Sequence, residues 1–497
     1  MPRLPGWFPA LLPFIPVALY FLLPNHNQGS DAWGYTALEL KRQAQGTPYF
    51  SPHHLLFHEF GHFSYRLLPA KFMDFMGWMQ VLNAFFGGLS LWFFYKISLH
   101  SFDKKTALVL TFLVGSTFGI IRFATENETY VIPITLSLAG SLALLKRNNS
   151  FKWLYAGFLL LGLAVLFHQI HIWWWLAAVI ALGLNKRALP AVFLSLIAVV
   201  GSYMLAANSQ GQSWLSFPFS DAFSGTVQII PDFNNVKFTA INLLRTLLQI
   251  HGNILYFLKA NSILAGLSIM GLVFMVVSLF QKNRQNEQFE SWVSNNRILL
   301  FFRLAAFFHL LWAFYSVGNA EFMVMLPFLG LLSFPAFIQR HGNKFLALGA
   351  GLLFWNISVY SIPHKVFRLS VPDEMINSLR TFRQDNKALY YISRQKVLLE
   401  NYAEAKRIDL QKMNVILLSA PSDRGKHTVD QPDLDTLVLN GHCVITDCRE
   451  FPEPTSRGSI LAGNGNSIFL KKYKLQNLRS VPSFFGNIQM DRISPQQ

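Results

Sequence analysis

Charged residues are scarce in this chain. They make up 14% of its 497 residues, whereas 52% are hydrophobic and 15% are aromatic. An ordinary soluble domain carries about a quarter charged residues. The sequence also lacks a phosphate loop, a G-x-G-x-x-G fingerprint and an internal repeat. The scarcity of charge excludes an ordinary soluble protein and favours helices that satisfy their backbone hydrogen bonds inside a lipid bilayer.

Long apolar blocks are what the sequence has instead. About eleven of them are long enough for the bilayer core, at 7–23, 75–97, 106–124, 129–145, 153–167, 171–184, 188–207, 261–280, 298–317, 322–338 and 345–362. The 171–184 block is short, and a re-entrant segment is the alternative there. The first block has no small-x-small cleavage site, so it is expected to remain as the first span.

Lysine and arginine are distributed unevenly between the loops. With the N-terminus in the cytoplasm, the inner loops and Arg3 hold 14 of them, whereas the outer loops, including 24–74 and 208–260, hold seven. This bias follows the positive-inside rule. It places the N-terminus inside and, for an odd number of spans, the tail outside. The net charge of +16 therefore reports topology and does not call for a nucleic-acid partner.

The sequence pattern changes after residue 362. Helical stretches alternate there with short β-like runs, which predicts a small α/β domain. The helices are expected at 373–386 and 394–409, and the strands at 388–392, 415–418, 443–446 and 468–470. The chain thus divides into a membrane module, 1–362, and a non-cytoplasmic domain, 363–497. Cys443 and Cys448 form a disulfide or stay free; both outcomes are open.

The first outer loop, 24–74, contains the most prominent polar segments. S-D-A-W-G-Y begins at Ser30, and a helix is predicted from Asp31 to Gln45. A second helix is predicted from Pro52 to about Leu68, and both are expected to lie along the membrane interface. Asp31 is a candidate general base or metal ligand. The alternative is a carboxylate that only caps its helix.

Acids also mark two other outer turns. Glu126 and Glu128 flank a short turn. They are either ordinary solvated loop residues or ligands of a divalent cation such as Mg²⁺ or Mn²⁺. Arg122 lies one turn earlier, and its spacing favours a resting pair with Glu126 over a lipid phosphate contact. Asn319 and Glu321 lie in a later turn. A carboxylate so close to the bilayer is costly unless it is used.

Histidines mark a further outer turn. His168 and His171 stand next to three tryptophans, 173–175, that are typical of an interfacial belt. These histidines contact phosphate or sugar, or they are polar residues at the level of the lipid headgroups. Both readings stay open.

The first loop also contains H-E-F-G-H at 58–62. On a helix, His58 and His62 face one way, and Glu59 is placed to activate a zinc-bound water. A catalytic zinc needs a third protein ligand. The extended motif would require histidine at position 68, which is Leu68, and the chain has no Asp-Gly pair. A zinc protease is therefore an alternative, and not the favoured reading.

Residues 1 to about 362 resemble the GT-C glycosyltransferases, which take sugars from polyprenyl-phosphate carriers. They are similar to the bacterial dolichyl-phosphate-mannose-type mannosyltransferases and aminoarabinose transferases. The resemblance lies in the first span followed by an Asp-bearing loop, and in four motifs. These are G-S-D-A-W-G-Y around Asp31, S-P-H-H-L-L at 51–56, E-N-E-T-Y at 126–130 and G-N-A-E-F-M-V-M-L-P at 318–327.

The resemblance implies an inverting transfer on the outer face of a bacterial inner membrane, with Asp31 as the general base. The polyprenyl phosphate would be stabilised by cations, by histidines or by a metal at Glu126 and Glu128. The candidate donor-binding residues are His53, His54, Arg66, Lys71, Arg122, His168, His171, Arg245, Lys259, Asn319 and Glu321. The acceptor is a lipid, a glycan or a protein. A flippase for lipid-linked glycans is a further alternative, but it predicts charges in mid-membrane rather than at the outer ends.

Overall fold

The computed structural model describes residues 11–68, 72–147, 150–182, 186–219, 233–251, 254, 258–259, 261–281, 296–316, 319–367, 369–382, 388–420, 434–449, 469–483 and 486–496. Contacts between residues group the chain into two compact units. The first unit contains Met1–Asn25, Gly46–Gln249 and Ile263–Ile362, and the second contains His26–Gln45, Ile250–Ser262 and Pro363–Gln497. The early segment His26–Gln45 therefore belongs with the tail.

The first unit is built from helices. They are α2 (Phe14–Leu22), α4 (Phe57–Arg66), α5 (Phe75–Ser98), α6 (Lys104–Gly115), α7 (Phe118–Thr125), α8 (Val131–Leu145), α9 (Phe151–Phe167), α10 (Ile172–Leu182), α11 (Leu189–Ser209), α12 (Phe233–Leu247), α14 (Ser262–Phe280), α15 (Asn296–Tyr315), α16 (Leu326–Ser333) and α17 (Pro335–Asn356). Shorter pieces are η1 (Gln169–His171), η2 (Phe217–Phe219), η3 (Ala320–Met323), η4 (Ile357–Ser361) and α18 (Ile362–Val366).

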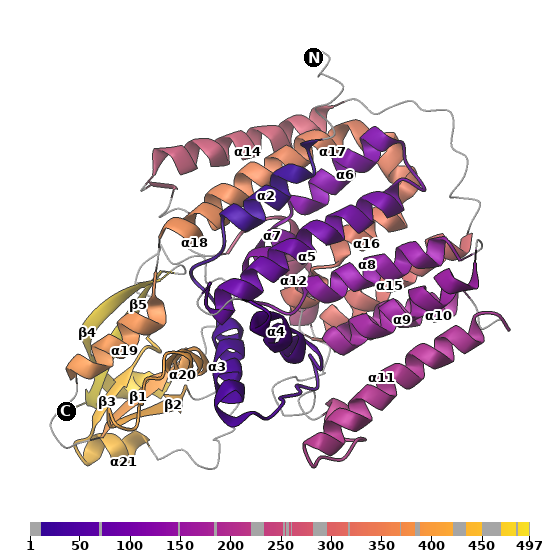
Figure 1. The fold of residues 1–497 in the computed structure, drawn as a ribbon. Coiled ribbons are helices and arrows are strands. Elements are labelled where there is room, and N and C mark those ends of the chain that lie inside the picture. Colours follow the sequence, from indigo (N-terminus) through magenta and orange to yellow (C-terminus); the bar gives the residue numbers. More distant parts are fainter. Residues whose placement is uncertain are drawn as a thin grey trace. The chain divides into compact units, whose positions relative to one another are not determined.

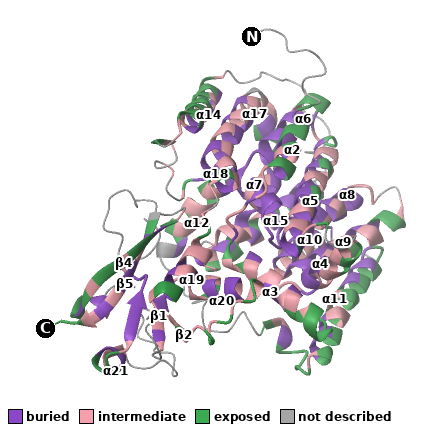
Figure 2. Ribbon diagram, turned by 60° about the vertical axis from the view of Figure 1, so that its left-hand side comes forward, coloured by how far each residue is buried: buried purple, intermediate pink, exposed green. Residues whose placement is uncertain are grey.

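Helices α5, α8, α9 and α11 pack in that order, each against the next (Figure 1). The contact between α8 and α9 depends on two glycines. A Cβ atom added at Gly157 would lie 2.6 Å from the Leu144 side chain, and one added at Gly140 would lie 2.9 Å from the Gly157 carbonyl oxygen. Small residues at such a contact let two helix backbones approach closely. Figure 2 shows the result: α5 and α8 are largely buried, whereas α11 and α14 expose much of their surface.

Only some helices in the described part of the chain are long enough to cross a bilayer. Four are long and apolar enough to cross a bilayer: Leu189–Ser209, Ser262–Phe280, Arg297–Tyr315 and Lys344–Val366. If each of two bent helix pairs counts as one span, the number of candidate spans rises to six. Three further apolar helices are shorter. The predicted count of about eleven spans is therefore not confirmed, although the mainly helical, apolar class is.

The two bends fall inside blocks that the sequence predicted as single spans. Helices α6 and α7 meet at 64°, because the hydroxyls of Ser116 and Thr117 donate to backbone carbonyls of the preceding turn. Asn356 donates to the Ser116 carbonyl oxygen at 2.9 Å and holds the break. The second pair bends by 79° at Pro335, which has no backbone N–H to continue the helix. Hydrophobicity alone does not reveal such breaks.

The second predicted helix of the first outer loop begins later than expected. The second predicted helix of the first loop forms only as α4, because residues 51–56 make turns. The N–H of His54 donates to Ser51, and that of Leu56 donates to Leu166 on α9. In the 208–260 loop, helix α12 runs from Phe233 to Leu247.

The second unit is a five-stranded sheet in the order β2-β1-β3-β5-β4. Its strands are β1 (Leu389–Ser393), β2 (Val415–Ser419), β3 (Cys443–Thr446), β4 (Tyr473–Ser483) and β5 (Gly486–Pro495). Strand β1 pairs in parallel with β2 and β3, and the β4–β5 hairpin joins antiparallel to β3. Helices α19 (Val371–Phe382) and α20 (Lys396–Ala405) contribute to the core on one face, and α21 (Leu434–Leu439) to that on the other.

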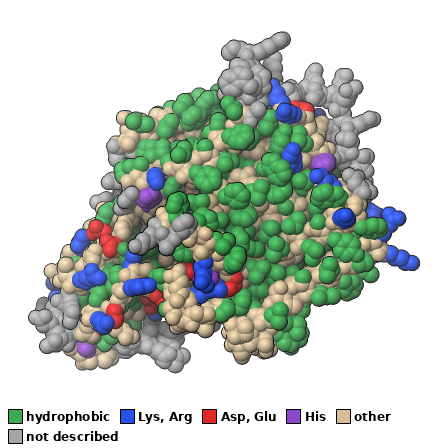
Figure 3. Space-filling view, in the orientation of Figure 1, with side chains coloured by type: hydrophobic (Ala, Val, Ile, Leu, Met, Phe, Trp, Pro, Cys, Tyr) green, Lys and Arg blue, Asp and Glu red, His purple; other side chains and the backbone are tan. Residues whose placement is uncertain are grey.

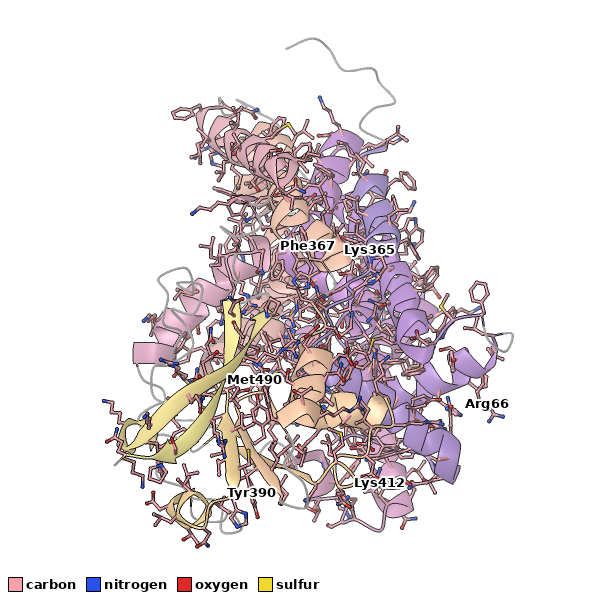
Figure 4. The ribbon with its side chains drawn as sticks, turned by 90° about the vertical axis from the view of Figure 1, so that its left-hand side faces the viewer. Arg66, Lys365, Phe367, Tyr390, Lys412 and Met490 are labelled. Atoms are coloured by element: carbon pink, nitrogen blue, oxygen red, sulfur yellow. The ribbon has the colours of Figure 1, made fainter. Side chains whose placement is uncertain are left out.

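Helix α3 (Ser30–Gln45) packs on α20 within this unit. Trp33 meets the Tyr402 ring edge-to-face at 4.8 Å, and Lys41 pairs with Glu404 at 2.5 Å. Tyr390 and Met490 mark β1 and β5 of the sheet in Figure 4. The α3 boundaries agree with the predicted helix. The packing of α3 on α20 was not predicted from the sequence.

The tail confirms most of its predicted elements. The first three predicted strands form, and both predicted helices form, the second in a shortened version; residues 383–386 of the first lie outside the described residues. The run 468–470 was predicted wrongly, since Phe469 and Leu470 form a 3₁₀ turn. The β4–β5 hairpin was not predicted, because the register shift between Asn477 and Arg479 interrupts its alternation. Cys443 and Cys448 are buried free thiols.

The two units differ in the side chains that they expose. Hydrophobic side chains cover a broad face of the helices of the first unit, as Figure 3 shows, while charged side chains are frequent on the second unit. An apolar outer face suits helices that meet lipid rather than water.

Candidate functional site

The turn between α7 and α8 carries two buried carboxylates. Glu126 and Glu128 are 5% and 4% exposed. Asn83 on α5 holds the turn, because its side-chain amide donates to the carbonyl oxygens of Glu126 at 2.8 Å and of Glu128 at 2.7 Å. A buried carboxylate is costly unless donors or a cation compensate for the lost water. The turn therefore requires partners for its side chains.

Glu126 has such partners on both carboxylate oxygens. Arg122 donates from Nε to Oε2 at 3.1 Å, which confirms the predicted resting pair. Asn25 donates to Oε1 at 2.7 Å, and the Tyr360 hydroxyl donates to the same oxygen. Residues from the end of α2, from α7 and from η4 thus meet at one buried carboxylate.

Glu321 joins them from the other acidic turn. Asn319 opens η3 by accepting the Glu321 N–H on Oδ1 at 3.0 Å. Glu321 Oε1 lies 3.7 Å from Arg122 Nη2, and Oε2 accepts the Tyr130 hydroxyl at 2.9 Å. The structure therefore brings together the two acidic turns that the sequence singled out. We call Arg122, Glu126 and Glu321, together with Tyr130 and Tyr360, the arginine–glutamate network.

Arg245 of α12 adds a second guanidinium to this region. Its Nε atom is buried and finds no hydrogen-bond partner among the residues that the structure describes. Burial and the positive charge of Arg122 lower the pKa of Arg245 to about 10, while Glu321 and Glu126 oppose that shift. Arg245 is therefore a cation at neutral pH with a donor atom available.

A divalent cation does not fit the resting geometry of this network. The Glu126 carboxylate already accepts three donors, and one of them is the Arg122 guanidinium, which repels a metal ion. Mg²⁺ and Mn²⁺ take oxygen ligands in their first shell. Across the described residues, no group of three or more His, Cys, Asp or Glu side chains is arranged to hold a metal. The resting geometry therefore does not fit the predicted Mg²⁺ or Mn²⁺ site at Glu126 and Glu128.

Three buried histidines lie beside the network. His168 follows α9, His171 ends η1 and His309 lies in α15; they are 4%, 0% and 0% exposed. The His168 ring centroid lies 4.8 Å from that of Tyr130 and 6.5 Å from that of His171, which in turn lies 5.9 Å from His309. We call these three residues the histidine row. Its burial removes the headgroup-level reading of His168 and His171.

The first loop reaches the histidine row through His53 and His54. His53 Nδ1 lies 3.0 Å from Gln169 Oε1, and its carbonyl oxygen accepts the Gln169 N–H. The His54 ring meets that of His168 edge-to-face at 4.4 Å. Burial holds the pKa of His54 well below its usual value, and positive charge on neighbouring histidines would lower it further. These candidate donor-binding histidines therefore gather in one place.

The H-E-F-G-H segment lies on α4. His58 is buried, and Glu59 Oε1 accepts the Tyr49 N–H at 3.2 Å. The described part of the chain supplies no third ligand for His58 and His62. The zinc-protease alternative therefore gains no support from the geometry.

Asp31 lies in the second unit, in the first turn of α3. Its side chain is exposed, and Oδ1 accepts the Ser30 hydroxyl at 3.2 Å. Asn401 on α20 fixes this end of the helix by donating to the Ser30 carbonyl oxygen at 3.0 Å. A first-turn carboxylate is also favoured by the helix dipole. Its position therefore agrees with a helix-stabilising role as well as a catalytic one.

The remaining candidate cations lie elsewhere. Arg66 is exposed at the end of α4 and points outward (Figure 4). Lys259 is exposed in the second unit. Lys71 lies outside the described residues. Among the candidate cations other than Arg122, the described residues place only Arg245 next to the arginine–glutamate network.

Three residues of this region were missed by sequence reasoning. Tyr130 closes the E-N-E-T-Y motif, so its position was visible although its role was not. His309 is an ionisable residue within an apolar span, which is in itself a signal of function. Tyr360 carries no local signal, because its partner Glu126 is 234 positions away in the sequence.

Comparison with solved structures identifies proteins of similar fold. The chain is similar to ArnT from Cupriavidus metallidurans bound to undecaprenyl phosphate, with 12% identity, a TM-score of 0.52 and 98% of each chain covered. The chain has the GT-C fold. No family model and no curated protein sequence matches it. Two other matches are ArnT in the apo state (12%, TM-score 0.46, 99% of each chain) and the apo oligosaccharyltransferase of Archaeoglobus fulgidus (15%, TM-score 0.34, 81% of this chain and 56% of that chain).

The GT-C fold confirms the resemblance drawn from the short motifs. It extends over nearly the whole chain, including the α/β tail, for which the sequence offered no individual motif. At 12% identity the likeness concerns the fold and assigns no residue. The roles of Asp31 and of the arginine–glutamate network therefore rest on the residues themselves.

Proposed function

We propose that the chain is a membrane glycosyltransferase that takes its sugar from a polyprenyl-phosphate carrier. The GT-C fold carries this proposal, because it is shared over 98% of the chain with a protein whose structure holds undecaprenyl phosphate. The pair of guanidiniums at Arg122 and Arg245 supports it. Guanidinium groups present several N–H donors and are well suited to phosphate.

The proposed reaction is an inverting displacement. An acceptor hydroxyl oxygen attacks the anomeric carbon from the face opposite the phosphate. The bond from that carbon to the phosphate oxygen breaks, and its electron pair leaves with the polyprenyl phosphate. The acceptor's proton passes to a base, which we assign to Asp31 from its motif and its exposed carboxylate. Positive charge from Arg122 and Arg245 stabilises the leaving phosphate.

The transfer is assigned to the non-cytoplasmic face, with the tail from Pro363 outside. Support comes from the excess of Lys and Arg in the predicted inner loops and from the two acidic turns, which the predicted topology places together on the outer side. We therefore assign the protein to a bacterial inner membrane, with its active site in the periplasm. The acceptor belongs to the lipids, glycans or proteins available there.

Substitution of Asp31 tests the assignment of the base. In Asp31→Asn, transfer of labelled sugar from an undecaprenyl-phosphate donor is expected to fall by about 10² to 10⁴, the usual contribution of a general base. The unfolding temperature is expected to stay unchanged, since asparagine keeps the size of the side chain. Asp103→Asn is the matched control, because Asp103 caps α6 and asparagine is as good an N-cap residue. Full activity of Asp31→Asn would remove Asp31 from the mechanism.

The two alternatives make separate predictions. A zinc protease requires one tightly held zinc that is lost in His58→Ala. A flippase requires that lipid-linked glycan transport is the same in the double variant Asp31→Ala/Glu126→Ala as in the original chain. Metal analysis and a vesicle transport assay thus discriminate both from the glycosyltransferase.

A further inference from the structure

Four ring nitrogens of the histidine row are buried without a partner. These atoms are Nε2 of His168, Nε2 of His171 and both ring nitrogens of His309; across the described residues, none has a hydrogen-bond partner. Buried polar groups in native proteins nearly always find one, either in the protein or in a bound molecule. The histidine row therefore calls for something that supplies hydrogen-bonding atoms.

The hydrogen bonds on the opposite side of each ring decide what is missing. The Ile170 N–H donates to His168 Nδ1 at 3.3 Å, so that nitrogen carries a lone pair and the neutral ring has its hydrogen on Nε2. The Ser137 hydroxyl lies 2.7 Å from His171 Nδ1 and finds no other side-chain partner in the described part of the chain. Ser137 therefore donates, and His171 also has its hydrogen on Nε2. These tautomers follow from the network of partners.

The row thus presents two unpaired N–H donors, and both are uncharged. Burial holds the pKa of His168 well below its usual value, with positive charge on His171 as a further cause that would lower it. His309, when neutral, adds one donor and one acceptor. Neutral donors suit hydroxyl oxygens, whereas a phosphate is better served by the guanidiniums of Arg122 and Arg245.

The position of the row fits a sugar next to a phosphate. Tyr130 connects the two groups of residues: its hydroxyl donates to Glu321 at 2.9 Å, and its ring packs on His168. Glu321 in turn lies 3.7 Å from Arg122. In a polyprenyl-phosphate sugar, the hydroxyl-bearing ring is bonded directly to the phosphate. A sugar subsite must therefore adjoin the guanidiniums that hold the phosphate.

We propose that His168 and His171 donate hydrogen bonds to hydroxyl oxygens of the donor sugar, with His309 completing the subsite at its inner end. This inference rests on the proposed function and deepens it, because it separates the recognition of the sugar from that of the lipid phosphate. The donor's phosphate binds at Arg122 and Arg245, and its sugar binds at the histidine row.

Binding measurements on the full chain in nanodiscs test this division. The probes are undecaprenyl phosphate alone and undecaprenyl phosphate linked to mannose, glucose or 4-amino-arabinose. The variants His168→Phe and His171→Phe remove the N–H donors. The variants His168→Gln and His171→Gln keep an N–H donor on a side chain without an aromatic ring. His100→Phe, at an exposed position after α5, is the matched control.

We expect at least one sugar-linked lipid to bind more tightly than undecaprenyl phosphate. Each Phe variant should reduce that advantage about tenfold, equivalent to about 1.4 kcal/mol, and leave the affinity for undecaprenyl phosphate unchanged. The Gln variants should retain part of it. A sugar advantage that survives both substitutions, or equal loss for all lipids, would overturn the subsite. If the original chain binds no polyprenyl phosphate at all, the proposed function fails and this inference fails with it.

Discussion

The arginine–glutamate network and the histidine row are neighbours in the first unit, and their hydrogen bonding differs. In the network, both oxygens of Glu126 accept donors, and Glu321 is matched by Arg122 and Tyr130. In the row, Nε2 of His168 and Nε2 of His171 have no partner among the described residues. Glu126 and the three histidines are buried, whereas the side chains of Arg122 and Glu321 are 21% and 27% exposed.

The difference is one of charge. A buried ion must be paired within the protein itself, because the cost of an unpaired one reaches several kcal/mol. A neutral imidazole can leave a donor unpaired at about 1–3 kcal/mol. The chain can therefore pair its two carboxylates, Glu126 and Glu321, in a resting network, while the neutral histidines are left available for a ligand. Three substitution experiments test this contrast.

Breaking the network should have the largest effect. In Arg122→Met, the carboxylates of Glu126 and Glu321 lose their shared cation, and we expect the free energy of unfolding to fall by about 3–5 kcal/mol. Unfolding in mixed detergent micelles measures it. Lys105→Met, at an exposed site on α6, is the control and should change it by less than about 0.5 kcal/mol. A loss below about 1 kcal/mol in Arg122→Met would show that the network does not need its cation.

The histidines should make stability fall in acid. Because burial lowers the folded-state pKa of His54 and His168 below the unfolded value, the unfolded chain binds more protons as the pH drops below about 6.5. Each such histidine then reduces the free energy of unfolding by up to about 1.4 kcal/mol per pH unit. Unfolding measured from pH 7.5 to 5.0 should show a shallower decline in His168→Gln. Parallel declines would mean that His168 does not titrate in this way.

Substitution of His309 should have the smallest effect, and one of opposite sign to the network variant. Phenylalanine puts a carbon ring in place of the His309 imidazole and so removes both of its unpaired nitrogens. The free energy of unfolding without ligand is therefore expected to rise by about 1 kcal/mol. The same micelle assay measures it. A loss of more than about 1 kcal/mol would instead show that these nitrogens have partners in the resting protein, and the contrast between the two groups would disappear.

Sequence patterns predicted what is local in the site. The i, i+4 spacing of Arg122 and Glu126 gave their ion pair, and the N-cap signal at Ser30 and Asp31 gave the start of α3. The acidic turns were found individually because a carboxylate at a bilayer edge is unusual. Their meeting at Arg122 depends on the packing of helices far apart in the chain, which no local spacing reports. The Tyr360–Glu126 contact is of this kind.

Breaks in regular structure were the main failure. The bend after Gly115 is made by side-chain hydroxyls that return to the backbone, and an apolar-block search counts those residues as helix. The β4–β5 hairpin was lost for a related reason, since one extra residue near Asn477 shifts the alternation of its side chains. Asp31 was located correctly on its helix, but the packing of that helix on α20 needed the structure.

The pairing of α3 with α20 has a consequence for biogenesis. Asn401 and the Ser30 carbonyl that it holds are 371 positions apart. At roughly 5–20 residues per second of synthesis, α3 emerges about 20–70 s before its partner exists. During that interval, Ala32, Ala37 and Glu39, all buried in the finished protein, have no α20 to cover them. The buried face of α3 must therefore be sheltered against lipid or a chaperone until α20 has been made.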